Sequence, residues 1–336
     1  MSEKKNIRVG DVEIQGDVIL SPMAGFSDSP YRQITREFGS AFSFTEFVST
    51  DGISRGSKKS IDLFRFQECE RPIFFQIFGN KLDVITEAAK IIEELNPDVI
   101  DLNMGCSVTK VAHKGSGAGL LKNPSYAGKI IESLSKNVRV PITAKIRLGW
   151  DHKSLNYKEV VSTLEESGVK AISVHGRTKS MGYTGKADWN AIAEIKSFAK
   201  VPIFGNGDIQ TYKEAKDRIN ETGVDAVLIG RAAIGNPWIF KGIEKSSLKF
   251  SEIREGIYRH LKLMLEFYGE RQGLILFRKH LSKYLRGFFG IADLREKLVT
   301  VTDLKDFYRL LDEFNSNIVE AKKIFTNTKE VACTFS

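Results

Sequence analysis

Eight short apolar runs, each ending in polar residues, recur along the first 231 residues at the spacing of a strand-helix repeat. The runs are VILSPMA (18–24), FSFTEF (42–47), PIFFQIFG (72–79), VIDLNMG (99–105), PITAKIRLG (141–149), AISVHGR (171–177), VPIFGNG (201–207) and AVLIGR (226–231). Such short runs, rich in β-branched residues and apolar on both alternations, are typical of parallel strands buried on both faces. Because eight such strands close a barrel, we expect an α/β protein with a (β/α)8 TIM barrel.

The polar residues at the ends of these runs indicate an enzyme. Active sites of β/α barrels lie at the carboxyl ends of the strands. The residues that fall there are Met23, Gln76, Asn103, Lys145, Arg147, His175, Asn206 and Arg231. Their concentration on one rim predicts a functional site.

The 336 residues exceed a minimal barrel of ~250 residues, so a second, smaller unit is expected. We predict a barrel domain over 1–243, in which residues 7–17 form a hairpin that covers the barrel bottom. A helical domain is expected over 249–336, with periodic segments at 251–269, 273–289 and about 303–325.

The net charge of +8 is compatible with a polyanionic partner. From Arg271 to Ala292 there are five basic residues and no Asp or Glu. Lys279, Lys283 and Arg286 are spaced to share one helix face, with Arg278 beside them.

Three cysteines, Cys69, Cys106 and Cys333, are far apart and form no CxxC pattern. This argues against a disulfide framework or a zinc site and for a reducing cytoplasm. The N-terminus MSEKKNIRVG lacks the apolar stretch of a secretory signal, and no apolar run is long enough to span a membrane. We therefore expect a cytoplasmic protein that binds neither a metal nor a membrane. We also expect it to be a monomer.

Glycines after the last two strands predict a phosphate site. The segments FGNGDIQT (204–211) and IGRAAIGNP (229–237) free main-chain N–H groups, and helix N-termini are expected after both. In β/α barrels, the loops that follow the seventh and eighth strands commonly bind a phosphate group. Arg231 adds a positive charge, and Asp208 is expected to cap a helix.

The remaining rim suits a planar heterocycle with donors and acceptors along its edge. Gln76, Lys145 and His175 would converge there with the main chain of Met23 and Ala24. Flavin mononucleotide (FMN) fits, because Lys145 and His175 would stabilise the charge that its ring gains on reduction.

Cys106 is a candidate proton donor. It follows DLNMG at the fourth strand end and opens a long connection, 105–122, whose glycine-rich centre, 115–119, we expect to be a mobile flap. A neutral thiol with a pKa of ~8.5 can donate a proton near neutral pH. No role is assigned to Cys69 or Cys333.

Seven motifs together resemble the bacterial tRNA-dihydrouridine synthases. They are SPMAGFSDSPYR, FFQIFGN, DLNMGCSVTKVAHKGSGAGLL, ITAKIRLGW, SVHGRTKSMGYTGKADW, FGNGDI and VLIGRAAIGNPWIF. The sequence Arg278-Lys279-His280 followed by Tyr284 is similar to the B-type branch. The resemblance covers about residues 18–290.

This resemblance implies roles residue by residue. The residues that would contact FMN are Pro22, Met23, Ala24, Gln76, Lys145 and His175. Those that would hold its phosphate are Asn206, Gly207, Asp208, Gly230 and Arg231. Cys106 matches the general acid, and Asn103, Arg147 and Arg177 match residues near the target uridine. Ser107 departs from the pattern, since proline commonly follows the cysteine.

The implied reaction is reduction of the uracil C5–C6 bond in the tRNA D-loop, with NADPH or NADH as reductant. The helical domain would bind tRNA through Arg278, Lys279, Lys283 and Arg286. Three alternatives remain open at this stage. They are a flavin-dependent reductase of a free pyrimidine, a Schiff-base aldolase that uses Lys145, and a non-catalytic tRNA-binding factor.

Overall fold

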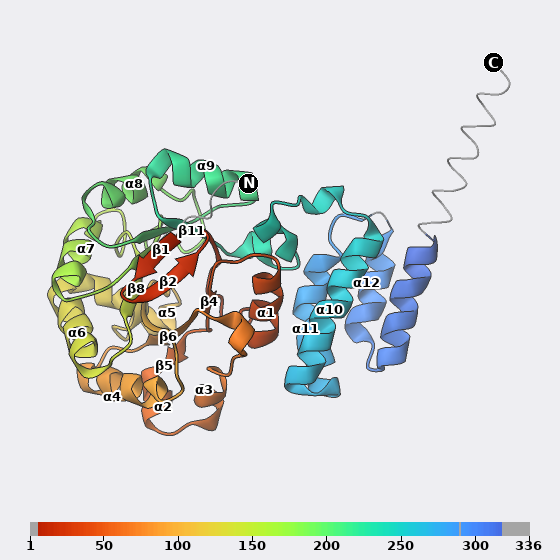
Figure 1. The fold of residues 1–336 in the computed structure, drawn as a ribbon, viewed down its shortest axis with the longest axis horizontal. Coiled ribbons are helices and arrows are strands. Elements are labelled where there is room, and N and C mark those ends of the chain that lie inside the picture. The colour runs from red at the N-terminus through yellow and green to blue at the C-terminus, as the bar shows by residue number, and fades with distance from the viewer. Residues whose placement is uncertain (1–5, 289, 318–336) are drawn as a thin grey trace, which may run out of the picture. The chain divides into compact units, whose positions relative to one another are not determined.

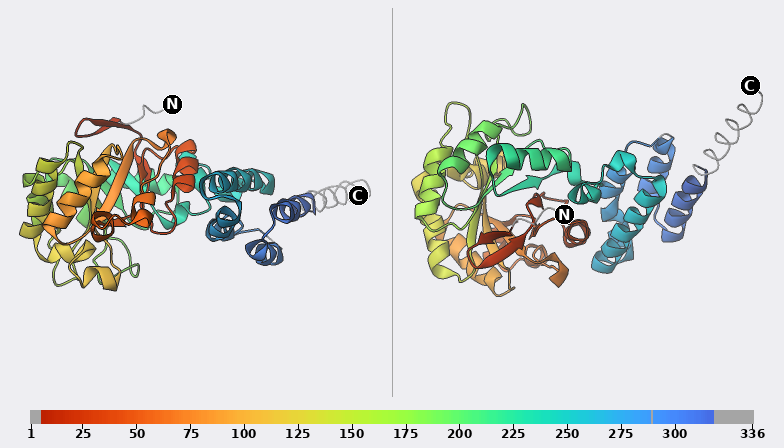
Figure 2. Two further views of the ribbon diagram at one scale, coloured as in Figure 1. Left: turned by 90° about the horizontal axis from the view of Figure 1, so that it is seen from below. Right: turned by 45° about the horizontal axis from the view of Figure 1, so that its top comes forward.

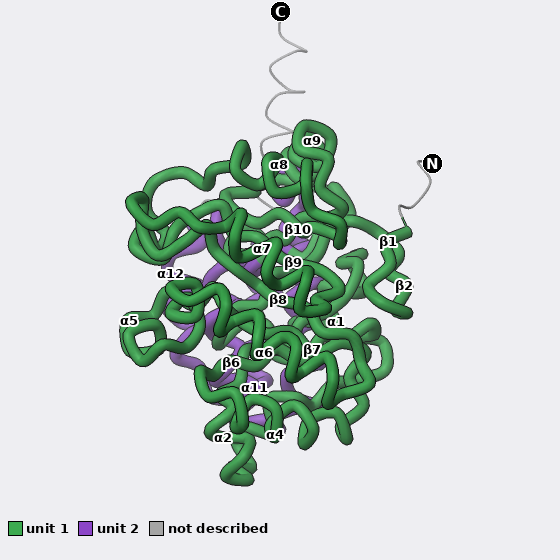
Figure 3. Tube along the Cα trace, turned by 90° about the vertical axis from the view of Figure 1, so that its left-hand side faces the viewer, with its two compact units in different colours: residues 1–233, 237–243 green, residues 234–236, 244–336 purple. Residues whose placement is uncertain are grey.

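The computed structural model describes residues 6–288 and 290–317. The chain divides into two compact units (Figure 3). One contains Met1–Ala233 and Pro237–Ile243, and the other contains Ile234–Asn236 and Glu244–Ser336. Each unit is described by itself below.

The first unit is an eight-stranded parallel β/α barrel, as the eight apolar runs predict. Its strands are β3 (Val18–Leu20), β4 (Ser43–Phe44), β6 (Ile73–Phe78), β7 (Val99–Met104), β8 (Ile142–Arg147), β9 (Ile172–His175), β10 (Ile203–Asn206) and β11 (Ala226–Ile229). They pair in the order β3-β11-β10-β9-β8-β7-β6-β4, and the short strand β5 (Val48–Ser49) continues beside β6. A hydrogen bond from the Ala41 N–H to the Val18 carbonyl, 2.9 Å long, joins the first strand to the second.

Amphipathic helices surround the barrel (Figures 1 and 2). They are α1 (Ser29–Glu37), α4 (Leu82–Glu93), α6 (Pro124–Asn137), α7 (Tyr157–Glu166), α8 (Trp189–Phe198) and α9 (Tyr212–Thr222). Pro30 and Pro124 lie in first turns, where a missing N–H costs no hydrogen bond. In α4, Ile85, Ala89 and Ile92 lie on one helix face and are fully buried.

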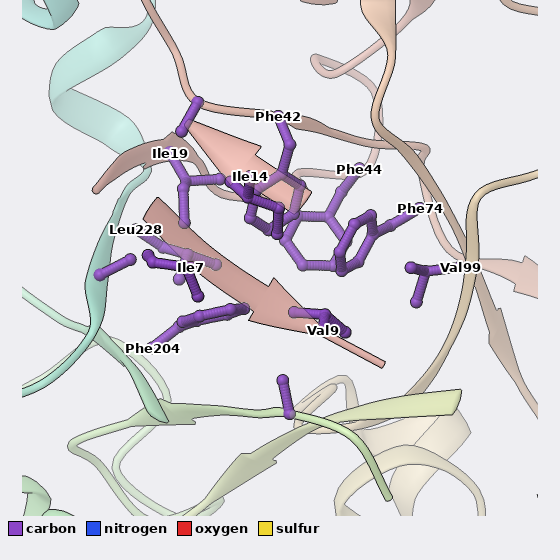
Figure 4. Packing of buried hydrophobic residues seen from close by; sticks show 13 residues of the cluster. Ile7, Val9, Ile14, Ile19, Phe42, Phe44, Phe74, Val99, Phe204 and Leu228 are labelled. Atoms are coloured by element: carbon purple, nitrogen blue, oxygen red, sulfur yellow. The ribbon is translucent and has the colours of Figure 1, made fainter. Parts of the chain in front are cut away.

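An antiparallel hairpin closes the barrel at the amino ends of its strands. It consists of β1 (Asn6–Val9) and β2 (Val12–Gln15), with Ile7 opposite Ile14. Figure 4 shows Ile7, Val9 and Ile14 packed against aromatic and aliphatic side chains of the barrel strands, Phe44 and Phe74 among them. Burial of these side chains contributes on the order of 1.5–3 kcal/mol each, which fixes the bottom of the barrel.

The long connection 50–70 is built from short helices, α2 (Thr50–Ser54), α3 (Lys58–Asp62) and η1 (Glu68–Glu70). Glu70 is fully buried and forms a 2.6 Å ion pair with Arg32 of α1. The Arg32 guanidinium also donates to the Ser27 and Arg65 carbonyls, at 2.7 and 2.9 Å. Breaking such a buried pair typically costs about 3–5 kcal/mol, so this anchor fixes the connection against the barrel.

The second unit is helical. It contains η5 (Lys245–Ser247), α10 (Phe250–Tyr268), α11 (Glu270–Tyr284), α12 (Ile291–Thr300) and a further helical segment at 304–317. The prediction of one helix over 273–289 was wrong, because α11 ends at Tyr284 and Gly287 follows with φ of +101°. Positions 318–325 of the predicted last helix, and Cys333, lie outside the described residues. Among the described helices, none has the length and apolarity needed to cross a membrane.

Candidate active site

A row of buried polar side chains lies at the carboxyl ends of strands β6 to β10. Strand register places Asn103 opposite Lys145 and His175 opposite Asn206. The Lys145 ammonium reaches across the intervening strand and donates to Asn206 Oδ1 at 3.2 Å. Gln76 is fully buried in the same region. The structure therefore brings together these five residues, which the sequence placed at strand ends.

Lys145 is a buried ammonium with little compensation. Its pKa is lowered to about 8, first by burial and then by the charge of Arg147, while Asp101 acts in the opposite direction. The group therefore still carries its charge near neutral pH, but at a cost to folding. A buried cation with free donor capacity can stabilise negative charge that develops on a bound group.

His175 is neutral at physiological pH. Burial, followed by the positive charges of Lys145, Arg147, Arg177 and Arg231, lowers its pKa well below the usual range. Arg177 Nη1 lies 3.3 Å from His175 Nε2. Because a guanidinium can only donate, this contact requires Nε2 to accept and leaves the proton on Nδ1.

Cys106 follows β7 and is anchored through its main chain. Its N–H donates to Asn103 Oδ1 at 2.9 Å, and its carbonyl accepts from the Ala118 N–H at 3.2 Å. The side chain is buried, with 8% exposure. Burial raises the pKa of the thiol, and the charge of Arg147 opposes that shift. Cys106 is therefore protonated at neutral pH.

The glycine-rich part of the connection after Cys106 is packed. It contains α5 (Thr109–Ala112) and the 3-10 helix η2 (Gly117–Lys122), in which residues 117–121 are all buried. Gly117 has φ of +56°, and a Cβ there would lie 2.9 Å from the Cβ of Cys106. Only glycine fits this approach, so the packing argues against the mobile flap expected from the sequence.

Two buried arginines organise the loop between β9 and α8. Arg147 donates to the Gly105 carbonyl at 2.8 Å and to the Thr178 and Gly182 carbonyls at 2.8 and 2.9 Å. It thereby links the Cys106 segment to this loop. Arg177, with 2% exposure, donates to carbonyls of the same loop and to Asp208. Arg177 therefore fixes this loop beside the candidate site.

Tyr183 is a site residue that sequence reasoning missed. It lies in the same loop with 64% exposure. The guanidinium carbons of Arg231 and Arg147 lie 5.0 and 5.9 Å from its ring centroid, and the His175 ring is 6.4 Å away. An exposed aromatic ring among cations suits a planar, electron-rich ligand. No periodicity marks such a loop residue.

The predicted phosphate loops lie after β10 and β11, but their details differ from expectation. Asp208 does not cap a helix. Its φ is +56°, and its carboxylate accepts from Arg177 and from the Ala187 N–H. Thr211 is the residue that caps α9, together with Glu214. After β11 come two 3-10 helices, η3 (Arg231–Ala233) and η4 (Pro237–Lys241), so no α-helix begins directly there.

Gly207 and Arg231 differ in their accessibility at the predicted anion site. Gly207 is buried with φ of +140°, and a Cβ there would lie 2.4 Å from the Ala187 Cβ, so only glycine fits. The Arg231 side chain is 56% exposed and only 3.4 Å from Asp208 Oδ1. Gly230 lies beside the first rim segment, since a Cβ on it would be 3.7 Å from Met23 Sδ.

The first rim segment, residues 22–24, leads into a tight turn that begins at Met23. The Met23 N–H donates to Ser27 Oγ at 2.9 Å, and the Met23 carbonyl accepts from the N–H groups of Phe26 and Ser27. These bonds occupy the Met23 main chain. Ala24 is exposed, and Pro22 is half-buried.

Two lysines lie over the ring of Trp150, a second aromatic residue on the rim. Lys122 Nζ lies 3.5 Å and Lys179 Nζ 4.4 Å from its ring centroid. His113 lies beside the same ring at 5.7 Å. These residues come from three successive strand-to-helix connections, so they form a basic and aromatic surface on the rim.

In the second unit, the basic residues predicted to share one helix face separate into two groups. Lys279 and Lys283 belong to α11, whereas Arg286 follows its C-terminal residue, Tyr284, and is exposed. Arg278 donates to the Val301 carbonyl at 2.9 Å, at the end of α12. The helix is shorter than the sequence suggests, which removes Arg286 from its face.

Comparison with known proteins decides the family. A family profile described as Dihydrouridine synthase (Dus) matches residues 19–323. The chain belongs to the dihydrouridine synthase family. It is 33% identical over 329 residues to a probable tRNA-dihydrouridine synthase of Rickettsia conorii. The aligned region covers 95% of this chain and 99% of that protein.

Relatives named tRNA-dihydrouridine synthase B are also matched, as the resemblance to the B-type branch predicts. That of Pseudomonas syringae pv. tomato is 37% identical, over 86% of this chain and 88% of that protein. That of Pseudomonas aeruginosa is 36% identical, over 88% of this chain and 92% of that protein.

Solved structures support the fold of this dihydrouridine synthase family member. Histamine dehydrogenase from Rhizobium sp. 4-9 matches 83% of this chain with a TM-score of 0.57 and 14% identity. The chain spans about half the length of that protein, with 50% of it covered. At this identity the likeness concerns the barrel fold alone.

Proposed function

We propose that this protein reduces the C5–C6 double bond of uridine in tRNA to give dihydrouridine, with FMN as cofactor and NADPH or NADH as reductant. The family membership gives the reaction class. The observation that carries the proposal is a buried thiol, Cys106, fixed by Asn103 next to the strand-end row that contains Lys145. The site thus combines a proton donor with a buried positive charge.

The donor set of the barrel mouth is chemically suited to FMN. A buried ammonium, a neutral imidazole and a carboxamide, from Lys145, His175 and Gln76, provide donors and acceptors for a flavin ring edge. Asn206, Gly207, Gly230 and Arg231 would hold the phosphate, together with the main chain of Asp208. The Asp208 carboxylate is neutralised by Arg177, which permits an anion nearby. Pro22, Met23 and Ala24 would line the ring from the first rim segment.

When bound, the flavin supplies the hydride that is added to C6 of the uracil. Cys106 supplies the proton that C5 needs to complete the reduction. Because burial raises the pKa of this thiol, it is protonated before the reaction. The S–H bond breaks as the C–H bond at C5 forms, and the positive charge of Arg147 stabilises the thiolate that remains. A solvent proton then restores the thiol.

The uridine would lie among three residues of the site, Asn103, Arg147 and Arg177. Asn103 and Arg147 contact the Cys106 segment directly, and Arg177 fixes the loop that carries Tyr183. A uracil must leave its stack to reach this mouth, at a cost of a few kcal/mol. The exposed Tyr183 ring offers a stacking surface that offsets part of this cost.

Two basic surfaces would bind the tRNA backbone. In the barrel unit these residues are Lys122 and Lys179 around Trp150. In the helical unit they are Arg278, Lys279, Lys283 and Arg286. Such contacts release counterions and supply most of the salt-dependent affinity for a nucleic acid. The proposal includes a cytoplasmic, monomeric enzyme that needs no metal ion.

The test is reduction of unmodified tRNA by the purified, FMN-loaded protein with NADPH. We expect a yellow protein that forms dihydrouridine in tRNA, mapped by mass spectrometry, and leaves free uridine unchanged. Turnover of free uridine or uracil in preference to tRNA would instead favour the reductase of a free pyrimidine. Protein that binds no flavin on reconstitution would contradict the proposal.

A further inference from the structure

A continuous chain of hydrogen bonds runs inside the barrel from the Cys106 main chain to Asp101. The Cys106 N–H donates to Asn103 Oδ1 at 2.9 Å. Asn103 Nδ2 then donates to Gln76 Oε1 at 2.9 Å, and Gln76 Nε2 donates to Asp101 Oδ2 at 2.7 Å. Thr143 Oγ1 donates to the other oxygen of Asp101 at 2.6 Å. Asp101 is fully buried.

Strand register explains why these side chains meet. Gln76 lies opposite Asp101 on the neighbouring strand, and Thr143 lies opposite Asp101 on the other side. Asn103 is two residues after Asp101 in β7, so both point to the same face of the sheet. The row of Gln76, Asp101 and Thr143 thus lies one level below the row that contains Asn103 and Lys145.

The direction of every bond in the chain is determined from its two ends. A main-chain N–H can only donate, so the Asn103 oxygen must face Cys106 and its NH2 must face Gln76. The Gln76 oxygen must then face Asn103, which directs the Gln76 NH2 toward Asp101. Only an acceptor at position 101 completes this order. A donor there would oppose the Gln76 NH2 and reverse the amide.

We propose that Asp101 is a positioning residue: it fixes the orientation of the Gln76 and Asn103 amides and, through Asn103, anchors the main chain that carries Cys106. It touches no reacting group, because two amides separate it from the thiol segment. The catalytic meaning rests on the proposed role of Cys106, but the anchoring itself does not.

The proposal does not depend on the charge of Asp101. Burial raises its pKa, whereas the hydrogen bonds from Thr143 and Gln76 and the charge of Lys145 act in the opposite direction. The relay requires only that Oδ2 accepts a hydrogen bond. An ionised carboxylate satisfies this requirement. A carboxylic acid whose proton lies on Oδ1 also satisfies it, with Thr143 Oγ1 then accepting that proton's hydrogen bond.

An exchange of the two residues tests the relay. In the variant Asn103→Asp, a carboxylate faces the Gln76 oxygen, and rotation of the Gln76 amide only moves the clash to Asp101. In the double variant Asp101→Asn with Asn103→Asp, the whole chain can reverse. The residue at 103 then accepts from both Cys106 and Gln76, and the residue at 101 donates to Gln76. The numbers of carboxylates and amides stay the same.

The readout is the alkylation rate of Cys106 by iodoacetamide in the flavin-free, full-length protein, measured on the Cys106 peptide by mass spectrometry. The interaction energy between residues in contact commonly corresponds to about a tenfold change in a rate. We therefore expect Cys106 in Asn103→Asp to be alkylated about ten times faster than in wild type. The double variant should lie within about threefold of wild type. Asp101→Asn alone should do so too, because its amide oxygen can still accept from Gln76 while its NH2 donates to Thr143 Oγ1. Thr143→Val is the matched control, because it removes a bond to Asp101 that lies outside the relay; its rate should equal that of wild type.

A double variant as reactive as Asn103→Asp would overturn the proposal, because the effects would then be independent. The same holds if Thr143→Val accelerates alkylation as strongly as Asn103→Asp does. If Asn103→Asp does not fold, the double variant decides: a folded protein with a slowly reacting Cys106 supports the relay, and an unfolded one overturns it. No flavin or tRNA is present, so a failure of the proposed reaction would leave this result unchanged.

Discussion

Arg177 and Asp208 form a close ion pair, in which one guanidinium nitrogen lies 2.6 and 2.7 Å from the two carboxylate oxygens. The pair joins the loop after β9 to the loop after β10. Arg177 has 2% exposure, whereas the Asp208 side chain has 34%. The arginine therefore depends on Asp208 for its charge compensation, and the loop that carries Tyr183 depends on the arginine.

Asp208→Asn should loosen this loop. Leaving a buried arginine without its carboxylate is expected to lower the free energy of unfolding by about 1–2 kcal/mol, less than for a fully buried pair. Urea denaturation measures this change. The control is Asp217→Asn, which removes an exposed pair with Lys213 and should change stability by less than about 0.5 kcal/mol. Equal effects of the two variants would show that the Arg177 pair has no special importance.

Lys145→Met should stabilise the protein while abolishing activity. The Lys145 pKa is about 8 in the folded protein, against 10.5 ordinarily. The unfolded chain therefore binds more protons between these pH values, so wild-type stability should rise with pH across this window. At neutral pH the variant should be more stable by about 2 kcal/mol, and its stability should lack this rise. Thermal or urea unfolding at several pH values tests both expectations, and a less stable variant would contradict them.

The eight strands and their strand-end residues could be predicted from the sequence because burial on both faces forces short apolar runs. Gln76, Asn103, Lys145, His175 and Asn206 follow from that pattern alone. The register then brings them together without further information, since the carboxyl ends of parallel strands meet on one rim.

Gly117→Ala should disturb the Cys106 segment specifically. Alanine at φ of +56° is strained by roughly 1 kcal/mol, and its Cβ would also press on Cys106 at 2.9 Å. Gly56→Ala is the control, because Gly56 has φ of +67° with no atom within 4 Å of the added Cβ. We expect at least about tenfold loss of tRNA reduction for Gly117→Ala and little loss for Gly56→Ala, because overpacking adds about 1–3 kcal/mol. Similar activities would indicate that close approach to Cys106 is unimportant.

Lys122→Gln together with Lys179→Gln should weaken tRNA binding in a salt-dependent manner. Each lysine lies over the Trp150 ring. If each neutralises one phosphate, the slope of log affinity against log salt should fall by about 1 per lysine. Lys136→Gln is the control, because Lys136 lies in the last turn of α6, away from the strand carboxyl ends. An unchanged slope in the double variant would exclude this surface from tRNA binding.

The site residues that the sequence did not predict depend on three-dimensional packing. Tyr183 lies in an irregular loop whose position is set by Arg147 and Arg177, and no periodicity identifies it. Asp208 was expected to cap a helix, but its carboxylate binds Arg177 instead. The end of α11 was misplaced because its apolar stripe continues past Tyr284 to Phe288, although Gly287 interrupts the backbone.

The most direct test is the single-turnover rate of dihydrouridine formation in unmodified tRNA by the reduced, flavin-loaded protein, compared between wild type and Cys106→Ala. If Cys106 supplies the proton to C5, the variant should be slower by about 10²–10⁴-fold while it binds flavin and tRNA as wild type does. Formation of dihydrouridine at the wild-type rate by Cys106→Ala would contradict the account.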